Sequence, residues 1–104
     1  MNRIATTLLS SLVAVTVANT AALADAANGE KLARRWCASC HVVTADQRQG
    51  NTQAAPFSEM AKIPSLNAEK IALFLLAPHP PMPDMSLSRS EAADLAVFIE
   101  KQGK

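Results

Sequence analysis

The chain has 104 residues, with ten Lys and Arg against nine Asp and Glu, which gives a formal net charge of +1 at pH 7. This length leaves room for a single hydrophobic core and therefore for one folded domain. Nothing in the sequence forms a basic stripe with interleaved aromatic residues, which argues against nucleic acid as a partner.

Residues 1–24 have the pattern of a secretory signal peptide. Arg3 lies in a short basic start, residues 4–17 form a mostly apolar run, and residues 22–24, Ala-Leu-Ala, form a small-residue cleavage site. A membrane anchor is the competing interpretation, but Thr and Ser interrupt the run, which falls short of about 20 consecutive apolar residues. We therefore expect cleavage after Ala24, export to the periplasm, and no permanent membrane anchor.

The mature domain is then expected to comprise residues 25–104. Arg3 is the only charged residue before Asp25, so its removal leaves nine basic and nine acidic residues and a formal net charge of zero. A domain of this size usually needs a disulfide, a metal or a large apolar cofactor to complete its core. The only two cysteines, Cys37 and Cys40, lie in this part of the chain and are the candidates for such a link.

The first helix is predicted over residues 28–37, where Glu, Lys, Leu, Ala and Arg are good helix formers and Asn28 is a candidate cap. Residues 44–53 are rich in Gln, Asn, Thr and Gly without periodicity, which predicts a loop. One short helical turn is expected after Pro56.

The next helix is predicted from Asn67, its candidate cap, to Pro78, which ends it. Three apolar residues recur on one of its faces: Ile71, Phe74 and Leu75. Four prolines then fall within residues 78–83, which predicts a stiff, extended segment.

The last helix is predicted to begin with a capping box formed by Ser88 and Glu91. Its apolar residues recur every three or four positions: Ala92, Leu95, Ala96, Phe98 and Ile99. Alternation typical of strands is absent after the signal region. The mature chain is therefore predicted to be all-α, with about three main helices whose long loops wrap around a bound group.

Residues 37–41, Cys-Ala-Ser-Cys-His, form the signature of covalent c-type haem attachment. Two thiols three residues apart can reach the two vinyl groups, and the adjacent imidazole of His41 then lies beneath the iron as an axial ligand. A disulfide is the alternative, but the strand-and-helix pattern of thioredoxin-like proteins is missing. A zinc site would need a fourth ligand, and only His79 is spare.

The second axial ligand has three candidates in or beside the proline-rich segment: Met82, Met85 and His79. A thioether on a stiff loop is a suitable ligand, because the prolines reduce the entropy lost on ligation. His79 has two interpretations, a solvated loop histidine or an axial ligand of a bis-histidine centre.

The sequence resembles the small class I bacterial cytochromes c over nearly the whole mature chain. The resemblance rests on Gly29 eight residues before Cys37, the motif at residues 37–41, Pro56, the Met82-Pro83 pair, and the last helix. It implies the cytochrome c fold, one haem c per chain, and Met82 as the second axial ligand, with Met85 as the runner-up.

The resemblance further implies that Gly29 lies where the first and last helices cross, against Phe98, and that the Pro56 carbonyl accepts a hydrogen bond from the His41 ring. Three departures from the family pattern stand out. An aromatic residue common four positions before the first cysteine is Ala33 here, so Trp36 or Phe57 is expected to fill its volume. Tyrosine is absent and the only Trp lies next to Cys37, so Gln47 or Arg48 is expected to support the haem propionates, unless one propionate is solvated.

These observations predict a non-catalytic, monomeric one-electron carrier that docks transiently with a redox donor and a redox acceptor. Four basic residues are candidates for the docking face: Arg34, Arg35, Lys62 and Lys70. The alternative is a haem subunit bound permanently to a periplasmic dehydrogenase or oxidase. A third possibility, an enzyme or gas sensor, requires a five-coordinate iron.

Overall fold

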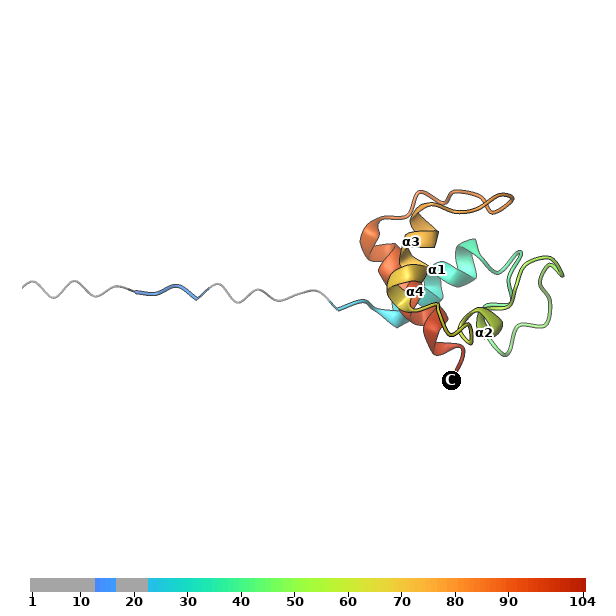
Figure 1. Ribbon diagram of the computed structural model, residues 1–104, viewed down its shortest axis with the longest axis horizontal. Coiled ribbons are helices and arrows are strands. Elements are labelled where there is room, and N and C mark those ends of the chain that lie inside the picture. Colours follow the sequence, from blue (N-terminus) through green and yellow to red (C-terminus); the bar gives the residue numbers. More distant parts are fainter. Residues whose placement is uncertain (1–12, 17–22) are drawn as a thin grey trace, which may run out of the picture.

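The computed structural model describes residues 13–16 and 23–104 (Figure 1). Most of the expected signal peptide therefore lies outside the described residues. The helices are α1 (Ala26–Trp36), α2 (Phe57–Met60), α3 (Ala68–Leu76) and α4 (Arg89–Lys101). The described residues contain no strand, and none of their helices is long and apolar enough to cross a membrane. The prediction of an all-α domain with three main helices is confirmed.

Helix α4 is the central element, because α1, α2 and α3 all pack against it. Its inner face carries the largest share of the core, in which Leu95 and Ile99 are almost completely buried. The predicted capping box is present: the Glu91 N–H donates to Ser88 Oγ at 3.1 Å, and the Ser88 N–H donates to the Glu91 carboxylate at 2.8 Å. The capping box therefore predicted the start of this helix, and the period of its apolar residues predicted its buried face.

Helix α1 begins earlier than predicted, because Asp25 and not Asn28 is its N-cap. The Asp25 carboxylate accepts from the N–H groups of Ala27 and Asn28 at 2.9 and 3.2 Å. Asp is as good a cap as Asn, and the two alanines after it extend the helix. Asn28 instead donates from Nδ2 to Asp94 of α4 at 2.8 Å, so it links two helices.

The crossing of α1 and α4 depends on Gly29. A Cβ at this position would lie 2.1 Å from the carbonyl oxygen of Asp94 and 2.8 Å from Cβ of Phe98. Only a residue without a side chain allows the two backbones to approach this closely. The contact expected from the family resemblance is therefore present. The end of α1, where the cysteines follow, is fixed relative to α4.

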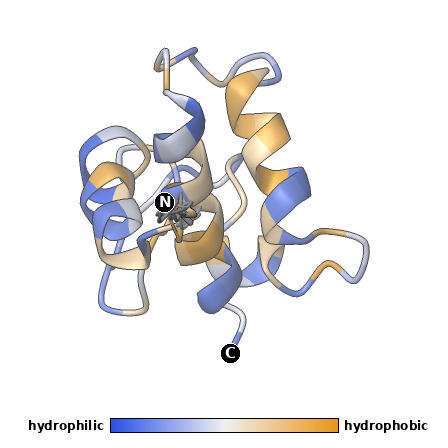
Figure 2. Ribbon diagram, turned by 90° about the vertical axis from the view of Figure 1, so that its left-hand side faces the viewer, coloured by the Kyte–Doolittle hydropathy of each residue, from blue (hydrophilic) through white to orange (hydrophobic). Residues whose placement is uncertain are grey.

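Helix α3 begins at the predicted cap, since Asn67 Oδ1 accepts from the Lys70 N–H at 2.9 Å. Ile71 and Leu75 are buried against α4, but Phe74 is 61% exposed, so its predicted inward position was wrong. A step of three residues turns 60° short of a full circle, which carries Phe74 to one side of the line through Ile71 and Leu75. In Figure 2, α3 is the helix coloured orange over most of its length, so it is strongly hydrophobic. Its buried residues, Ile71 and Leu75, nevertheless lie on one face only.

Phe57, one of the two candidates for the missing aromatic residue, belongs to the same buried core cluster as Ala33. It is 2% exposed, and its ring centroid lies 6.3 Å from that of Phe98 in an edge-on arrangement. Trp36, the other candidate, is 44% exposed at the end of α1. The helical turn expected after Pro56 is α2, which brings Phe57 into the core.

Candidate functional site

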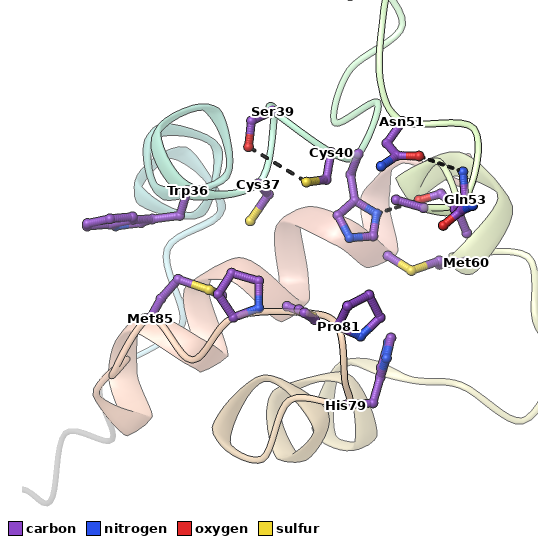
Figure 3. Close-up of a pocket in the computed structure, with 15 residues that line it drawn as sticks. Trp36, Cys37, Ser39, Cys40, Asn51, Gln53, Met60, His79, Pro81 and Met85 are labelled. Carbon is purple, nitrogen blue, oxygen red and sulfur yellow. Dashed lines mark hydrogen bonds between the residues drawn. The ribbon is translucent and has the colours of Figure 1, made fainter.

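A cavity of about 310 Å³ lies between the turn after α1 and the proline-rich loop between α3 and α4 (Figure 3). Six of the residues that line it were singled out from the sequence: Cys37, Cys40, His41, His79, Met82 and Met85. In Figure 3, Cys37 and Cys40 face Pro81 and Met85 across this space. The fold thus brings together two segments about 40 residues apart in the chain, each with metal-binding side chains.

The cysteine wall is a tight turn that continues directly from α1. The Cys37 N–H donates to the Ala33 carbonyl at 2.9 Å, and the His41 N–H donates to the Cys37 carbonyl at 2.8 Å. A further bond joins the Cys40 N–H to the Cys37 carbonyl at 3.1 Å. These bonds hold both thiols and the imidazole on one wall, and neither cysteine forms a disulfide.

The two thiols have different environments. Cys37 is buried, whereas Cys40 is exposed at the cavity surface. Burial, and to a smaller extent repulsion from Cys40, raises the pKa of the Cys37 thiol to about 11. Cys37 is therefore a neutral thiol at physiological pH, placed against the apolar side of the cavity.

His41 is oriented by a hydrogen bond from its ring. Its Nδ1 lies 2.6 Å from the carbonyl oxygen of Ala55. A carbonyl can only accept, so Nδ1 carries the proton and Nε2 keeps a lone pair that can bind a metal. The ring also packs against Phe57, with centroids 5.4 Å apart.

The expectation that Pro56 provides this carbonyl was wrong. The Pro56 carbonyl accepts instead from the N–H groups of Glu59 and Met60, at 3.0 and 3.1 Å, because Pro56 is the N-cap residue of α2. Pro56 also lies outside the cavity lining. Pro56 affects the His41 ring only indirectly, because it fixes the backbone directly after Ala55, whose carbonyl contacts the ring.

The opposite wall contains the two methionines. Both are half-buried and line the cavity, but only Met82 also packs against the hydrophobic core. The Met82 N–H donates to the carbonyl of His79 at 2.8 Å, which closes a turn within the proline-rich segment. Met82 is thus held from two sides, by the core and by its backbone.

Gln47 and Arg48 do not line the cavity, and their expected role as haem supports stays a prediction. The Gln47 side chain donates to the Ala38 and His41 carbonyls at 3.0 and 2.8 Å, and accepts from the Val43 N–H at 2.9 Å. These bonds use its polar atoms to brace the loop. Arg48 is exposed outside the lining.

Sequence reasoning did not place six other lining residues at the site: Trp36, Asn51, Gln53, Ala54, Ala55 and Met60. Asn51 is placed by a 2.6 Å bond from its N–H to the Cys40 carbonyl, and its Oδ1 accepts from the Gln53 N–H at 2.9 Å (Figure 3). Both belong to a polar loop in which composition alone could not distinguish the residues that turn inward. Their amides add polar groups to one side of the cavity.

Two free thiols beside an imidazole with an available Nε2, facing thioethers across a largely apolar space, form a donor set that suits a covalently bound haem. The family model for cytochrome c matches residues 26–103. This chain belongs to the cytochrome c family. Cytochrome c-552 of Bradyrhizobium diazoefficiens is 47% identical over 89 residues, which cover 85% of this chain and 86% of that protein. No solved structure matches.

Membership of the family implies a covalently bound haem c with its iron, and Cys37 and Cys40 of this cytochrome fit the attachment motif. The zinc alternative finds no support in the part of the chain that the structure describes, where no three His, Cys, Asp or Glu side chains gather as a metal site. As a cytochrome c, the protein is a haem-based electron carrier.

Proposed function

We propose that this cytochrome is a periplasmic one-electron carrier whose haem iron is bound by His41 and Met82. The observation that carries the proposal is the pairing of two walls: an oriented imidazole with a free Nε2 on one, and a core-packed thioether on the other. When bound, the haem supplies a ferric–ferrous couple, and thioether ligation raises its potential. Two strong-field ligands leave no coordination position for a substrate, so the proposed role is not catalytic.

Each residue of the site has a separate task in this proposal. Cys37 and Cys40 hold the porphyrin through two thioether bonds. The Ala55 carbonyl keeps the proton on Nδ1 of His41 and directs Nε2 inward. The closed turn at Met82 limits the movement of its sulfur, which favours the same ligands in both oxidation states.

The experiment is optical spectroscopy of the purified, haem-loaded protein. We expect a low-spin ferric spectrum with the weak far-red charge-transfer band of a bound thioether, and no rapid carbon monoxide binding by the reduced form. The band should be lost in Met82→Leu and kept in Met85→Leu, the matched control. A band that depends on Met85, or a high-spin wild type, would overturn the ligand assignment.

One observation favours a second candidate, a haem subunit bound permanently to a periplasmic dehydrogenase or oxidase. Three apolar residues of α3 are exposed: Leu73 at 63%, Phe74 at 61% and Leu76 at 39%. Permanent interfaces are larger and more hydrophobic than transient ones. Gel filtration of native cell extract distinguishes the two, because a free carrier elutes at its own small mass and a subunit elutes with its catalytic chain.

A further inference from the structure

His79 and Met82 are the two ends of one turn. The Met82 N–H donates to the His79 carbonyl at 2.8 Å, and a turn closed in this way brings its first and fourth residues within about 7 Å at Cα. Both side chains line the cavity that His41 faces. The turn therefore presents two side chains capable of binding iron from the same wall.

The imidazole of His79 has a nitrogen available for a metal. Its Nδ1 lies 3.2 Å from the carbonyl oxygen of Pro80, which can only accept, so this contact places the proton on Nδ1 and leaves the lone pair on Nε2. The side chain is exposed and forms no ion pair among the described residues. In Figure 3 its ring stands at the edge of the cavity, next to Pro81. No strong contact has to be broken for the ring to move inward.

Imidazole is an effective ligand for iron, whereas a thioether is soft and binds ferric iron weakly. What favours Met82 is position, since it packs against the core while His79 does not. Removal of the sulfur would leave His79 as the nearest strong ligand along the chain. Met85 is the rival, but Figure 3 places it beside Trp36, at the other end of the loop from His79.

We propose that His79 is a reserve axial ligand: when the Met82 sulfur leaves the iron, Nε2 of His79 binds in its place. One coordination bond breaks and another forms, with no change in the number of electrons. The resulting bis-histidine centre would have a lower reduction potential, because the thioether that raises the potential is lost. The inference rests on the proposed function, since it takes Met82 as the sixth ligand.

The composition makes this proposal unusually easy to test. The chain contains only two histidines, His41 and His79. A bis-histidine spectrum from a monomeric sample can therefore arise only if His79 binds the iron. Dilution of the sample excludes a ligand donated by a second molecule, because an intermolecular bond would weaken with dilution.

The test uses the haem-loaded full chain with Met82→Leu, which keeps the apolar volume of the loop. Electron paramagnetic resonance and near-infrared magnetic circular dichroism of the ferric form should show a low-spin bis-imidazole centre. A redox titration should show a reduction potential below that of the wild type. Met82→Leu/His79→Ala should become high-spin and bind carbon monoxide promptly when reduced. Met82→Leu/Met85→Ala, the matched control, should remain bis-imidazole, and His79→Ala alone should keep the far-red thioether band.

A high-spin Met82→Leu protein would overturn the reserve role of His79 while leaving Met82 ligation intact. A thioether band that persists in Met82→Leu and disappears in the double variant with Met85→Ala would also overturn the reserve role, because Met85 would then bind the iron. Met85→Leu alone decides whether the assignment of Met82 in the wild type falls with it: if the band is kept there, Met82 is still the wild-type ligand. A wild type that lacks the thioether band is a different result, because it refutes the proposed ligation by Met82 itself.

A second measurement applies if Met82→Leu does not mature. The ferric wild type in mild denaturant at neutral pH should lose the thioether band and gain the bis-imidazole signal, because local opening of the loop releases the sulfur first. The same treatment of His79→Ala should give no bis-imidazole signal. Equal behaviour of the two proteins would contradict the proposal.

Discussion

His41 shows how the loop backbone controls the chemistry of a single side chain. Its Nδ1 donates to the Ala55 carbonyl. The carbonyl of the next residue, Pro56, accepts the first hydrogen bonds of α2. The imidazole is therefore connected through one peptide to a helix that places Phe57 in the core. The orientation of the ring depends on packing some distance from the cavity.

Gln47 and Arg48 are neighbours with opposite roles, and they provide a matched pair of substitutions. Gln47→Ala removes bonds to the His41 carbonyl and the Val43 N–H, and it leaves half-buried groups without partners. We expect it to lower the free energy of unfolding by about 1–3 kcal/mol. Arg48→Ala should change it by less than about 0.5 kcal/mol, because the side chain is exposed and outside the cavity lining.

Denaturant unfolding of both haem-loaded variants, followed by far-ultraviolet circular dichroism, measures the difference. Equal stability of the two would contradict the bracing role of Gln47. A large shift of the reduction potential in Arg48→Ala, with none in Gln47→Ala, would support the expectation that Arg48 supports the haem.

At the scale of elements, the crossing of α1 and α4 positions the cysteine wall. The Asp25 N–H and Asn28 Nδ2 both donate to the Asp94 carboxylate, at 2.7 and 2.8 Å, close to the contact of Gly29 with the Asp94 carbonyl. Cleavage after Ala24 would turn the Asp25 nitrogen into the N-terminal ammonium group. The positive charge of this new N-terminus would then strengthen the hydrogen bond from the Asp25 nitrogen to the Asp94 carboxylate.

Gly29→Ala should be among the more damaging single substitutions in α1. The added Cβ would lie 2.1 Å from a backbone oxygen, which cannot rotate away, so the helices must separate. Overpacking of this kind costs about 1–3 kcal/mol. Thermal unfolding of the haem-loaded protein measures it, with the exposed Lys31→Ala in the same helix as the control. An unchanged melting temperature for Gly29→Ala would refute the close crossing.

Asp94→Ala should destabilise the protein by about 1–2 kcal/mol, because it removes both bonds to the start of α1. Asp94→Asn keeps the shape and one acceptor, and it should retain part of the stability. Denaturant unfolding of the two variants compares them. If both behave like the wild type, the carboxylate contributes nothing to the crossing.

The helix starts were predicted correctly where neighbouring residues alone determine the cap. Ser88, Glu91 and Asn67 cap helices as expected, because capping uses bonds within three or four residues. The predicted start of α1 was wrong because Asp and Asn are equally good N-cap residues, so local sequence does not distinguish Asp25 from Asn28. The contact of Asn28 with Asp94 goes with its place inside the helix. The outward position of Phe74 and the choice of Ala55 over Pro56 likewise depend on how the segments pack.

At the scale of the whole molecule, the site was predictable where the motif is contiguous. The sequence indicated Cys37, Cys40 and His41 directly, because the spacing of residues 37–41 carries the chemistry. Asn51, Gln53 and Met60 reach the cavity only through the path of a loop without periodicity. The proline-rich segment indicated the three candidates on the opposite wall, but the choice of Met82 among them depended on family resemblance, and ligation by Met82 remains a proposal.

The contacts of the four basic residues predicted for the docking face distinguish them from one another. Arg34 is paired with Glu30 at 2.8 Å and Lys62 with Glu59 at 3.7 Å, while Lys70 donates to the Ser65 carbonyl at 2.9 Å. Arg35 lies over the exposed ring of Trp36, 4.7 Å from its centroid, and Trp36 lines the cavity. Among the four candidates, Arg35 is thus the one that lies against a residue of the cavity lining.

Electron transfer to the physiological partner should therefore slow as ionic strength rises, and Arg35→Ala should slow it more than Arg34→Ala. Stopped-flow kinetics at several salt concentrations measures both effects. A rate that is indifferent to salt, or equal effects of the two substitutions, would remove Arg35 from the docking face.

Every assignment at this site depends on a haem that is covalently bound to Cys37 and Cys40. Redox-difference spectroscopy of the purified protein, repeated after denaturation and organic extraction, tests this attachment most directly. We predict a reversible c-type spectrum that stays with the polypeptide and is lost when both cysteines are replaced by Ala. A colourless chain after correct maturation, with the two sulfurs joined to each other, would contradict the account.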